Sequence, residues 1–399
     1  MRWVATVVVL LLLSVACQSQ TANQPAARHP SLWQPADLPG EPNGWRAAVF
    51  DQPRDCLWIA SRVPPDTAGS QEMVTLIRIN LADRTVVHTS FRLDAARFVG
   101  IWVLLDARDK VWTGWGRAVH VYDPDTDTVL SYPLPGFASL QLPPPAYDDF
   151  DGNFVGLVMD PGGEIWAAAS NVAAVFGFNP TLERWDRTIR LVWFNPYSFT
   201  QLAAPKPGLL IVSGYQSPVP NASVPVFARV NTANGNVGTV TAHPVREYAL
   251  IGQDRAVFID ETQALGTVNL TTGQVTMLAA NAPINANGAR FAPDANGHVW
   301  FSMVSYRNIG IGSVDLSTGA ITTYTFPYVD RPGVVLPDDC PSGAFHCIPS
   351  SAVADVGVQA IDIDANQNVW VVTEQPGAND PHLRAPIMAP VIELKVGKS

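Results

Sequence analysis

The feature that most constrains the fold of this 399-residue chain is a unit that recurs seven times along it. The unit begins with an apolar segment that ends in Asp or Pro. A Gly/Asn turn then leads into a strand with a central aromatic residue, and two further strands follow, joined by a Thr-Gly-type turn. The clearest copy spans residues 291–327, with markers at Asp294, Gly297, Trp300 and Gly319. Self-similarity at such a period is typical of solenoids, propellers and arrays.

The other six copies keep the turns but differ in their aromatic residue. Four retain it, as Trp58, Trp112, Trp166 and Trp370, and the copies around 207–235 and 253–273 lack the tryptophan. A tryptophan at one blade position in five copies is better explained as a core wedge between blades than as a ligand contact. The copies lie about 42 to about 70 residues apart, as four-stranded blades with variable loops would. We therefore predict an all-β fold, a seven-bladed β-propeller of four-stranded blades.

One strand is missing from the last copy, which ends with residues 391–396. Residues 32–39, near the N-terminus, resemble the ends of other copies, such as residues 132–135. We predict that this stretch supplies the outer strand of the seventh blade. A strand in that place closes the ring and leaves no free edge between the first and last blades.

An apolar leader at the N-terminus ends in a sequence that resembles a lipidation signal. Arg2 precedes an apolar run over residues 4–13, which has the length of a signal peptide and is too short to span a bilayer. The next four residues, Ser-Val-Ala-Cys ending at Cys17, resemble the lipobox of bacterial lipoproteins, in which the cysteine is acylated. Because Ser14 and Ala16 also fit an ordinary cleavage site, plain secretion stays open as the alternative.

The chain is accordingly expected to have three parts: a signal peptide over 1–16, a lipidated polar tether over 17–30 and a single propeller domain over 31–399. We expect an exported protein that is lipid-anchored to the membrane at the cell envelope, with a soluble secreted or periplasmic protein as the alternative. The formal net charge of −10 disfavours nucleic acid and anionic lipid as partners. Contact with the membrane is expected only through the lipid.

The four cysteines fit this exported location. If Cys17 is acylated, three remain, and Cys340 and Cys347 lie close together in one Pro/Gly-rich segment. Export favours a disulfide between these two. Cys56 is then expected to be a buried free thiol in a strand, although pairing of Cys56 with either of the other two stays open.

Loop lengths predict which face of the ring is functional. The turns between first and second strands and between third and fourth strands are short, and they lie on one face of a propeller. The long segments all fall on the opposite face, at 61–73, 136–153, 213–225, 328–357 and 375–389. Elaboration of one face is typical of a binding surface.

Several candidate site residues fall on that face. Four of them are expected near the mouth of the axis, where a tryptophan beside an arginine suits a sugar or an aromatic ligand: Trp115, Arg117, Tyr215 and Arg307. Three others share the long segment of blade 7 and could hold a metal ion or an acidic ligand, or simply form a polar loop: Glu374, His382 and Arg384.

An acidic stretch before the third copy has the carboxylate density of a calcium loop. Asp148, Asp149 and Asp151 lie within four residues of one another, and carboxylate oxygens are the ligands that Ca²⁺ prefers. The stretch lacks the glutamate that completes an EF-hand loop. A solvated acidic turn is therefore the second interpretation of these residues.

The repeat Asp-x-x-Gly-x-x-Trp, followed by Ile-Gly-x-x-Asp-x-x-Thr-Gly, resembles the streptogramin lyase (virginiamycin B lyase)-like propellers, best over residues 291–327. The resemblance implies a seven-bladed fold and, in the enzymes of that family, a Mg²⁺-dependent lyase with His and Glu on the axial face. Those enzymes typically carry Trp-Phe-Thr-Glu at the end of the second strand. Here Trp300 begins Trp-Phe-Ser-Met, and Thr-Glu occurs only at Thr373 and Glu374, shifted by one residue.

Two functions from different classes follow. The first is a non-catalytic propeller lipoprotein that binds an unknown protein, saccharide or small molecule through its long-loop face. The alternative is a metal-dependent lyase or lactonase-type enzyme with its site at the axis near Glu374, in which Ca²⁺ or Mg²⁺ would be the cofactor. No catalytic residue is assigned, because no nucleophile, metal-protease or phosphate-binding motif occurs in the sequence.

Overall fold

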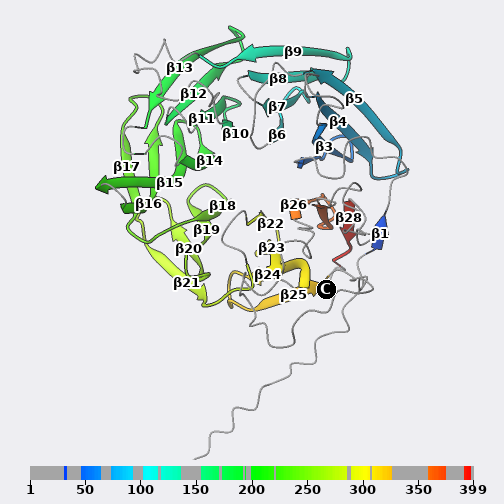
Figure 1. Cartoon of the computed structure of the whole chain (residues 1–399). Helices are drawn as coiled ribbons and strands as arrows, with labels where there is room; N and C mark the ends of the chain where they lie inside the picture. Colours follow the sequence, from blue (N-terminus) through cyan, green and yellow to red (C-terminus); the bar gives the residue numbers. More distant parts are fainter. Residues whose placement is uncertain are drawn as a thin grey trace, which may run out of the picture.

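Seven four-stranded antiparallel sheets surround a common axis (Figure 1). The structure, a computed structural model, describes residues 31–33, 46–63, 73–92, 102–115, 118–135, 154–169, 173–191, 194, 199–219, 222–284, 289–305, 308–325, 358–373 and 391–396. Within these ranges the regular elements are all strands. The predicted seven-bladed β-propeller is confirmed.

In blades 1 to 6 the four strands follow one another in the chain from the axis to the rim, whereas blade 7 takes its outermost strand from the N-terminus. Blade 1 contains β2 (Arg46–Asp51), β3 (Cys56–Val63), β4 (Met73–Asn80) and β5 (Val86–Arg92). Blade 2 contains β6 (Trp102–Leu105), β7 (Val111–Trp115), β8 (Ala118–Asp123) and β9 (Thr128–Pro133). Blade 3 contains β10 (Phe154–Met159), β11 (Ile165–Ala169), β12 (Ala174–Asn179) and β13 (Arg184–Arg190).

The second half of the ring repeats this order. Blade 4 contains β14 (Phe199–Lys206), β15 (Leu209–Val219), β16 (Ala222–Asn231) and β17 (Val237–Thr241). Blade 5 contains β18 (Glu247–Ile251), β19 (Arg255–Ile259), β20 (Leu265–Asn269) and β21 (Val275–Ala279). Blade 6 contains β22 (Phe291–Pro293), β23 (His298–Ser305), β24 (Asn308–Asp315) and β25 (Ile321–Thr325). Blade 7 contains β26 (Val358–Ile363), β27 (Val369–Thr373), β28 (Val391–Leu394) and β1 (Ser31–Trp33).

An N-terminal strand closes the ring, as predicted; it covers Ser31–Trp33, and residues 34–39 of the predicted stretch lie outside the described residues. β1 pairs antiparallel with β28 and becomes the outer strand of blade 7, with Ser31 opposite Glu393 and Trp33 opposite Val391. A second contact joins the same two blades, because Arg84 of blade 1 forms an ion pair with Glu393 at 2.8 Å. The first and last blades are therefore held together by a strand pair and by side chains.

One aspartate organises the first turn of most blades. In blade 2, Oδ1 of Asp106 accepts the backbone N–H groups of the residues two and four positions later, and Oδ2 accepts the indole N–H of Trp112 at 3.0 Å. The same indole–carboxylate bond joins Trp58 to Asp51, Trp300 to Asp294 and Trp370 to Asp364. All five tryptophans at this position are at most 3% exposed. Their predicted role as core wedges is confirmed.

The turns between third and fourth strands also satisfy their own polar groups. In blade 4, Oδ1 of Asn231 accepts the backbone N–H groups of Ala233 and Asn234, and Gly235 closes the turn at a φ of 72°. Gly273 takes the same place in blade 5, where a Cβ would lie 2.1 Å from the carbonyl oxygen of Val240 in the preceding blade. We call the face that carries these turns and the first turns the turn face, and the opposite face the long-loop face.

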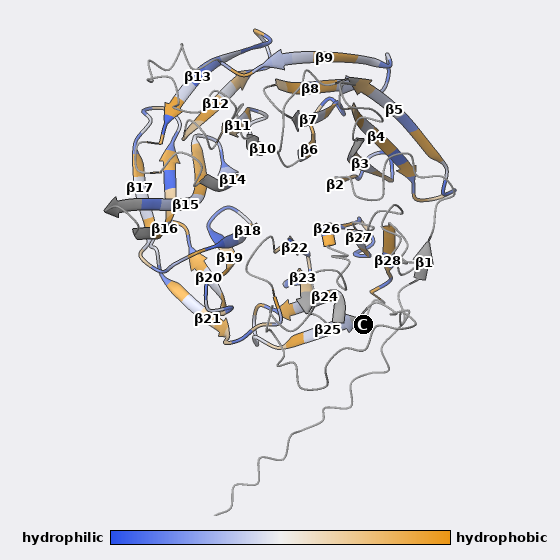
Figure 2. Cartoon of the chain, in the orientation of Figure 1, coloured by the Kyte–Doolittle hydropathy of each residue, from blue (hydrophilic) through white to orange (hydrophobic). Residues whose placement is uncertain are grey.

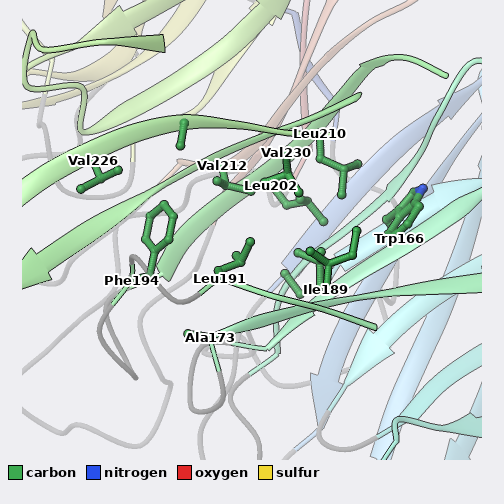
Figure 3. Packing of buried hydrophobic residues seen from close by; sticks show 13 residues of the cluster. Trp166, Ala173, Ile189, Leu191, Phe194, Leu202, Leu210, Val212, Val226 and Val230 are labelled. Atoms are coloured by element: carbon green, nitrogen blue, oxygen red, sulfur yellow. The ribbon is translucent and has the colours of Figure 1, made fainter. Parts of the chain in front are cut away.

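The apolar core lies in the seams between blades. Figure 3 shows one such cluster, in which Trp166 of blade 3 packs with Leu202, Leu210 and Val212 of blade 4. Strands of the interior such as β28 are mostly hydrophobic, whereas the rim strand β13 is mostly hydrophilic (Figure 2). Each blade thus buries its two faces against its neighbours and leaves its outer edge to solvent.

One segment expected to be a long loop is mostly strand. In blade 4, residues 213–225 belong largely to β15 and β16, which pair with each other as far as Val219 and Ala222. The neighbouring strands stop earlier, since β14 pairs with β15 only up to Gly214. The end of the hairpin is therefore a two-stranded ribbon on the long-loop face. The segments 136–153, 328–357 and 375–389 lie outside the described residues, as do residues 64–72 of the segment 61–73.

Candidate ligand site at the propeller axis

The inner strands carry a set of equivalent residues at one level of the axis, which we call the axial layer. Each member lies four residues before the aspartate of the first turn, or before the residue that takes its place in blades 4 and 5. On the second strand of the blade, it lies opposite the residue two positions after the recurring tryptophan, or after the residue that takes the place of this tryptophan. The seven members, in blade order, are Ala47, Trp102, Gly156, Gln201, Glu247, Arg290 and Ala360. Because inner strands run from the long-loop face to the first turns, the layer lies on the long-loop side.

The chemistry of the axial layer is uneven around the ring. Blades 1, 3 and 7 contribute small residues, and blade 2 contributes the half-buried Trp102. At Gly156 the reason is steric, because a Cβ there would lie 2.8 Å from Cβ of Leu202. The polar members Gln201, Glu247 and Arg290 come from three consecutive blades, 4 to 6. The layer therefore has one polar side.

Gln201 uses its side chain to hold the next blade. Its Nε2 donates to the carbonyl oxygen of Tyr248 at 2.6 Å, and its Oε1 accepts the backbone N–H of the same residue at 3.0 Å. Tyr248 lies on β18, the inner strand of blade 5, and no other described strand pairs with the axial edge of β18. The amide of Gln201 thus satisfies both backbone groups of one residue on that edge, which is a structural role.

Arg290 reaches the following seam in the same way. Its backbone N–H donates to Oγ of Ser302 at 2.9 Å, and its Nε donates to the carbonyl oxygen of Gln359 on β26 at 2.9 Å. The residue is half-buried. Within the described part of the chain, no acceptor bonds its Nη1 or Nη2 atoms. Arg290 therefore combines a structural contact with free donors.

A half-buried carboxyl lies at the seam between blades 7 and 1. Oδ2 of Asp362 on β26 accepts the backbone N–H of Phe50 on β2, and Oδ1 accepts the N–H of Ile363. Burial among the inner strands raises the pKa of Asp362 to about 6, although these two hydrogen bonds favour the charged form. This carboxyl titrates nearer to neutral pH than an ordinary aspartate.

A histidine–aspartate pair lies away from the axis, on the long-loop face of blade 5. Nε2 of His243 is 3.1 Å from Oδ2 of Asp260. Burial favours the neutral acid, but hydrogen bonds from Thr262, Ala264 and His243 hold the pKa of Asp260 below its usual value. As in the first turns, one oxygen of the aspartate accepts backbone N–H groups and the other contacts a ring nitrogen. Sequence reasoning missed it because the two residues are 17 positions apart in the chain.

Two of the residues predicted near the axial mouth are described. Tyr215 is half-buried and lies in the ribbon of β15, opposite Pro225 and two residues beyond the axial layer's partner Ser213. Trp115 ends β7 opposite Ala118. These two residues come from blades 4 and 2, respectively.

The remaining predicted positions lie outside the described residues. They are the ligand candidates Arg117, Arg307, Glu374, His382 and Arg384, the acidic stretch Asp148, Asp149 and Asp151, the lipidation candidate Cys17, and the disulfide candidates Cys340 and Cys347. Cys56, in contrast, is described. It is a buried free thiol, as expected, and burial raises its pKa to about 12.

Two further features are absent from the described ranges. No three His, Cys, Asp or Glu side chains there lie close enough together to hold a metal ion. No helix in those ranges has the length and apolar character needed to cross a bilayer.

Known proteins resemble this chain in fold rather than in sequence. No family model matches the sequence, and no curated protein matches it either. Among solved structures, virginiamycin B lyase from Staphylococcus aureus is 14% identical, with a TM-score of 0.56 over 88% of this chain and 94% of that chain. A streptogramin B lyase is 11% identical, with a TM-score of 0.59 over 91% and 97%. The WD40 repeats of RRP9 are 8% identical, with a TM-score of 0.56 over 91% and 98%.

These similarities define the class of protein. The chain is a seven-bladed β-propeller whose structural neighbours include streptogramin lyases and WD40 propellers. At such low identity the likeness concerns the fold alone, because one propeller architecture supports many unrelated functions.

Proposed function

We propose that this protein is an exported propeller, anchored to the cell envelope by a lipid on Cys17, that binds a ligand or protein partner through its long-loop face without catalysing a reaction. The anchor follows from the lipobox-like sequence and the polar tether after it. The binding role follows from the difference between the two faces of the ring. Propellers that bind partners are among the structural neighbours, and one of them belongs to a mitotic checkpoint complex.

The single observation that carries the binding role is the ribbon of blade 4. On the turn face of this blade, Asn231 and Gly235 close a short turn that bonds its own polar groups. On the long-loop face, β15 and β16 continue past their neighbours and expose Gln216 and Val224. Extra backbone that pairs with no other described strand is typical of a surface used for recognition.

Site-specific photo-crosslinking in cells tests this proposal. A photoreactive amino acid replaces Gln216 on the ribbon or, as the matched control, Ala233 in the opposite turn of the same blade. Both side chains are exposed. We expect a discrete adduct from position 216 and none from position 233. Adducts from both positions, or from position 233 alone, would contradict binding through the long-loop face.

A further inference from the structure

We propose that the axial layer holds an oxyanion, the carboxylate or phosphate group of a small ligand, through the guanidinium of Arg290. This inference rests on the proposed binding function and names the class of ligand. Arg290 comes from the polar side of the layer, which lies on the long-loop side of the axis.

Arg290 directly precedes the inner strand β22, and its hydrogen bond to blade 7 shows where its side chain points. Ala292, two residues later, packs with Trp300 and Ile361 in the cluster between blades 6 and 7. Residues two apart in a strand face the same side of the sheet. The stem of Arg290 therefore enters this seam, and its Nε–H bonds the carbonyl oxygen of Gln359 at 2.9 Å. The orientation of the guanidinium is fixed by that bond.

The bond to Gln359 leaves most of the guanidinium unused. Arginine has five N–H donors, and Nε supplies one of them. The four donors of Nη1 and Nη2 form no hydrogen bond or ion pair within the described part of the chain. No carboxylate among the described residues forms an ion pair with this half-buried guanidinium. A forked pair of donors also matches the two oxygens of a carboxylate or phosphate.

Two other half-buried arginines of this protein are neutralised by carboxylates, whereas a third, Arg78, lies over the ring of Trp58 and forms no ion pair with a described residue. Arg54 lies near Asp51 at 3.2 Å, and Arg84 near Glu393 at 2.8 Å. The carboxylate closest in position to Arg290 within the layer is Glu247. It faces a different seam, because Ala249, two residues later, packs between blades 5 and 6. This geometry explains why Glu247 does not neutralise Arg290.

In blade 4, the position equivalent to Arg290 holds Gln201, whose role is structural. Gln201 holds the neighbouring inner edge with one donor and one acceptor, and both are used. A glutamine at position 290 could donate to Gln359 equally well. The additional donors and the charge of arginine are therefore not explained by its contact with blade 7, and an anionic ligand explains them.

Calorimetric titration of the purified full chain tests the inference. The probes are inorganic phosphate and citrate, with chloride as the reference at constant ionic strength, because salt screens weak ionic binding. The variants are Arg290→Gln and Arg290→Lys, and the control is Arg255→Gln, an exposed arginine on the turn face of blade 5. Circular dichroism and thermal melting establish that each variant is folded. The lysine variant keeps the positive charge but lacks the paired N–H donors of the guanidinium.

We expect the wild type and the Arg255 variant to bind phosphate, citrate or both. Both Arg290 variants should bind at least about tenfold more weakly, because the bidentate contact is lost. The anion that binds more tightly identifies the recognised group of the ligand as a phosphate or a carboxylate. Equal binding by the Arg290 variants, or no binding of either anion by the wild type, would overturn the inference. Crosslinking from position 216 would survive that outcome, so failure of this site is distinct from failure of the proposed function.

Discussion

Asp362 on the inner strand of blade 7 accepts the backbone N–H of Phe50 on the inner strand of blade 1, with 2.5 Å between Oδ2 and the nitrogen. The two residues are 312 positions apart in the chain. Their bond lies at the seam where the ring closes, next to the apolar cluster that joins Phe50 and Leu57 to Ala360 and Val391. A titratable group therefore takes part in ring closure.

The stability of the protein should fall as the pH rises through the titration of Asp362. Its pKa is raised from 3.8 to about 6, so the folded state binds this proton more tightly than the unfolded state. The contribution is fully present below about pH 4 and is lost by about pH 6. A difference of this size corresponds to about 3 kcal/mol. Urea unfolding at several pH values measures it.

Asp362→Asn provides the comparison, since the amide does not ionise and its oxygen can still accept from Phe50. The variant should become more stable than the wild type as the pH rises from 4 to 7, by up to about 3 kcal/mol. A constant difference between the two proteins over this range would show that Asp362 has an ordinary pKa.

The indole–carboxylate bonds of the first turns should contribute measurably to stability. Trp370 and Asp364 are both buried and lie 3.1 Å apart. A double-mutant cycle with Trp370→Phe and Asp364→Asn should give a coupling energy of about 1.5–3 kcal/mol, the range for a buried hydrogen bond to a charged group. Denaturant unfolding of the four proteins supplies the free energies.

Blade 3 supplies the matched control for that cycle. Trp166 is buried, but its Nε1 has no hydrogen-bond partner among the described residues, and the guanidinium of Arg187 lies over its ring. The corresponding cycle with Asp160→Asn should give a coupling below about 0.5 kcal/mol. Equal coupling in the two blades would argue that the bond itself is unimportant.

Removal of the closing strand should weaken the whole ring. A chain that begins at residue 34 lacks β1 and exposes the edge of β28, where Val391 and Ile392 are fully buried. We expect its melting temperature to fall by about 5 °C or more, whereas a chain that begins at residue 31 should melt like the mature protein. Identical melting of the two truncated chains would contradict the role of β1 in closure.

Lipidation at Cys17 has a direct test. Cells grown with an alkyne-labelled fatty acid should yield a labelled protein in the membrane fraction. The Cys17→Ser variant should lose the label and appear in the soluble fraction, because residues 18–30 are polar and offer no apolar surface to the membrane. A labelled, membrane-bound Cys17→Ser protein would refute the assignment.

Metal addition separates the binding role from the enzyme alternative. A non-catalytic propeller should retain no Ca²⁺ or Mg²⁺ after dialysis, and millimolar concentrations of either ion should leave its melting temperature unchanged. Elemental analysis and thermal melting measure both. A clear stabilisation that is lost when Asp148, Asp149 and Asp151 are replaced would assign a metal site to the acidic stretch.

Recurring local chemistry explains why so much of the fold could be predicted. The turn aspartates bond groups within a few residues of themselves, as Asp106 does with Lys110 and Trp112, so most blades have a recognisable local sequence pattern. The missing final strand was visible as an incomplete repeat. The ribbon of blade 4 was mistaken for a loop because its Ser and Pro residues mask a strand pattern that only pairing between β15 and β16 stabilises.

The sequence by itself determined the blade number, the turn chemistry, the tryptophan wedges and the closing strand, because these depend on contacts within a blade or on counting repeats. Tertiary structure alone decided the contacts between blades. The bonds of Asp362 to Phe50, Arg290 to Gln359 and Gln201 to Tyr248 join residues at least 47 positions apart. Which side chain reaches the neighbouring inner edge depends on the pleat and the register of two adjacent sheets, and no local pattern records that combination.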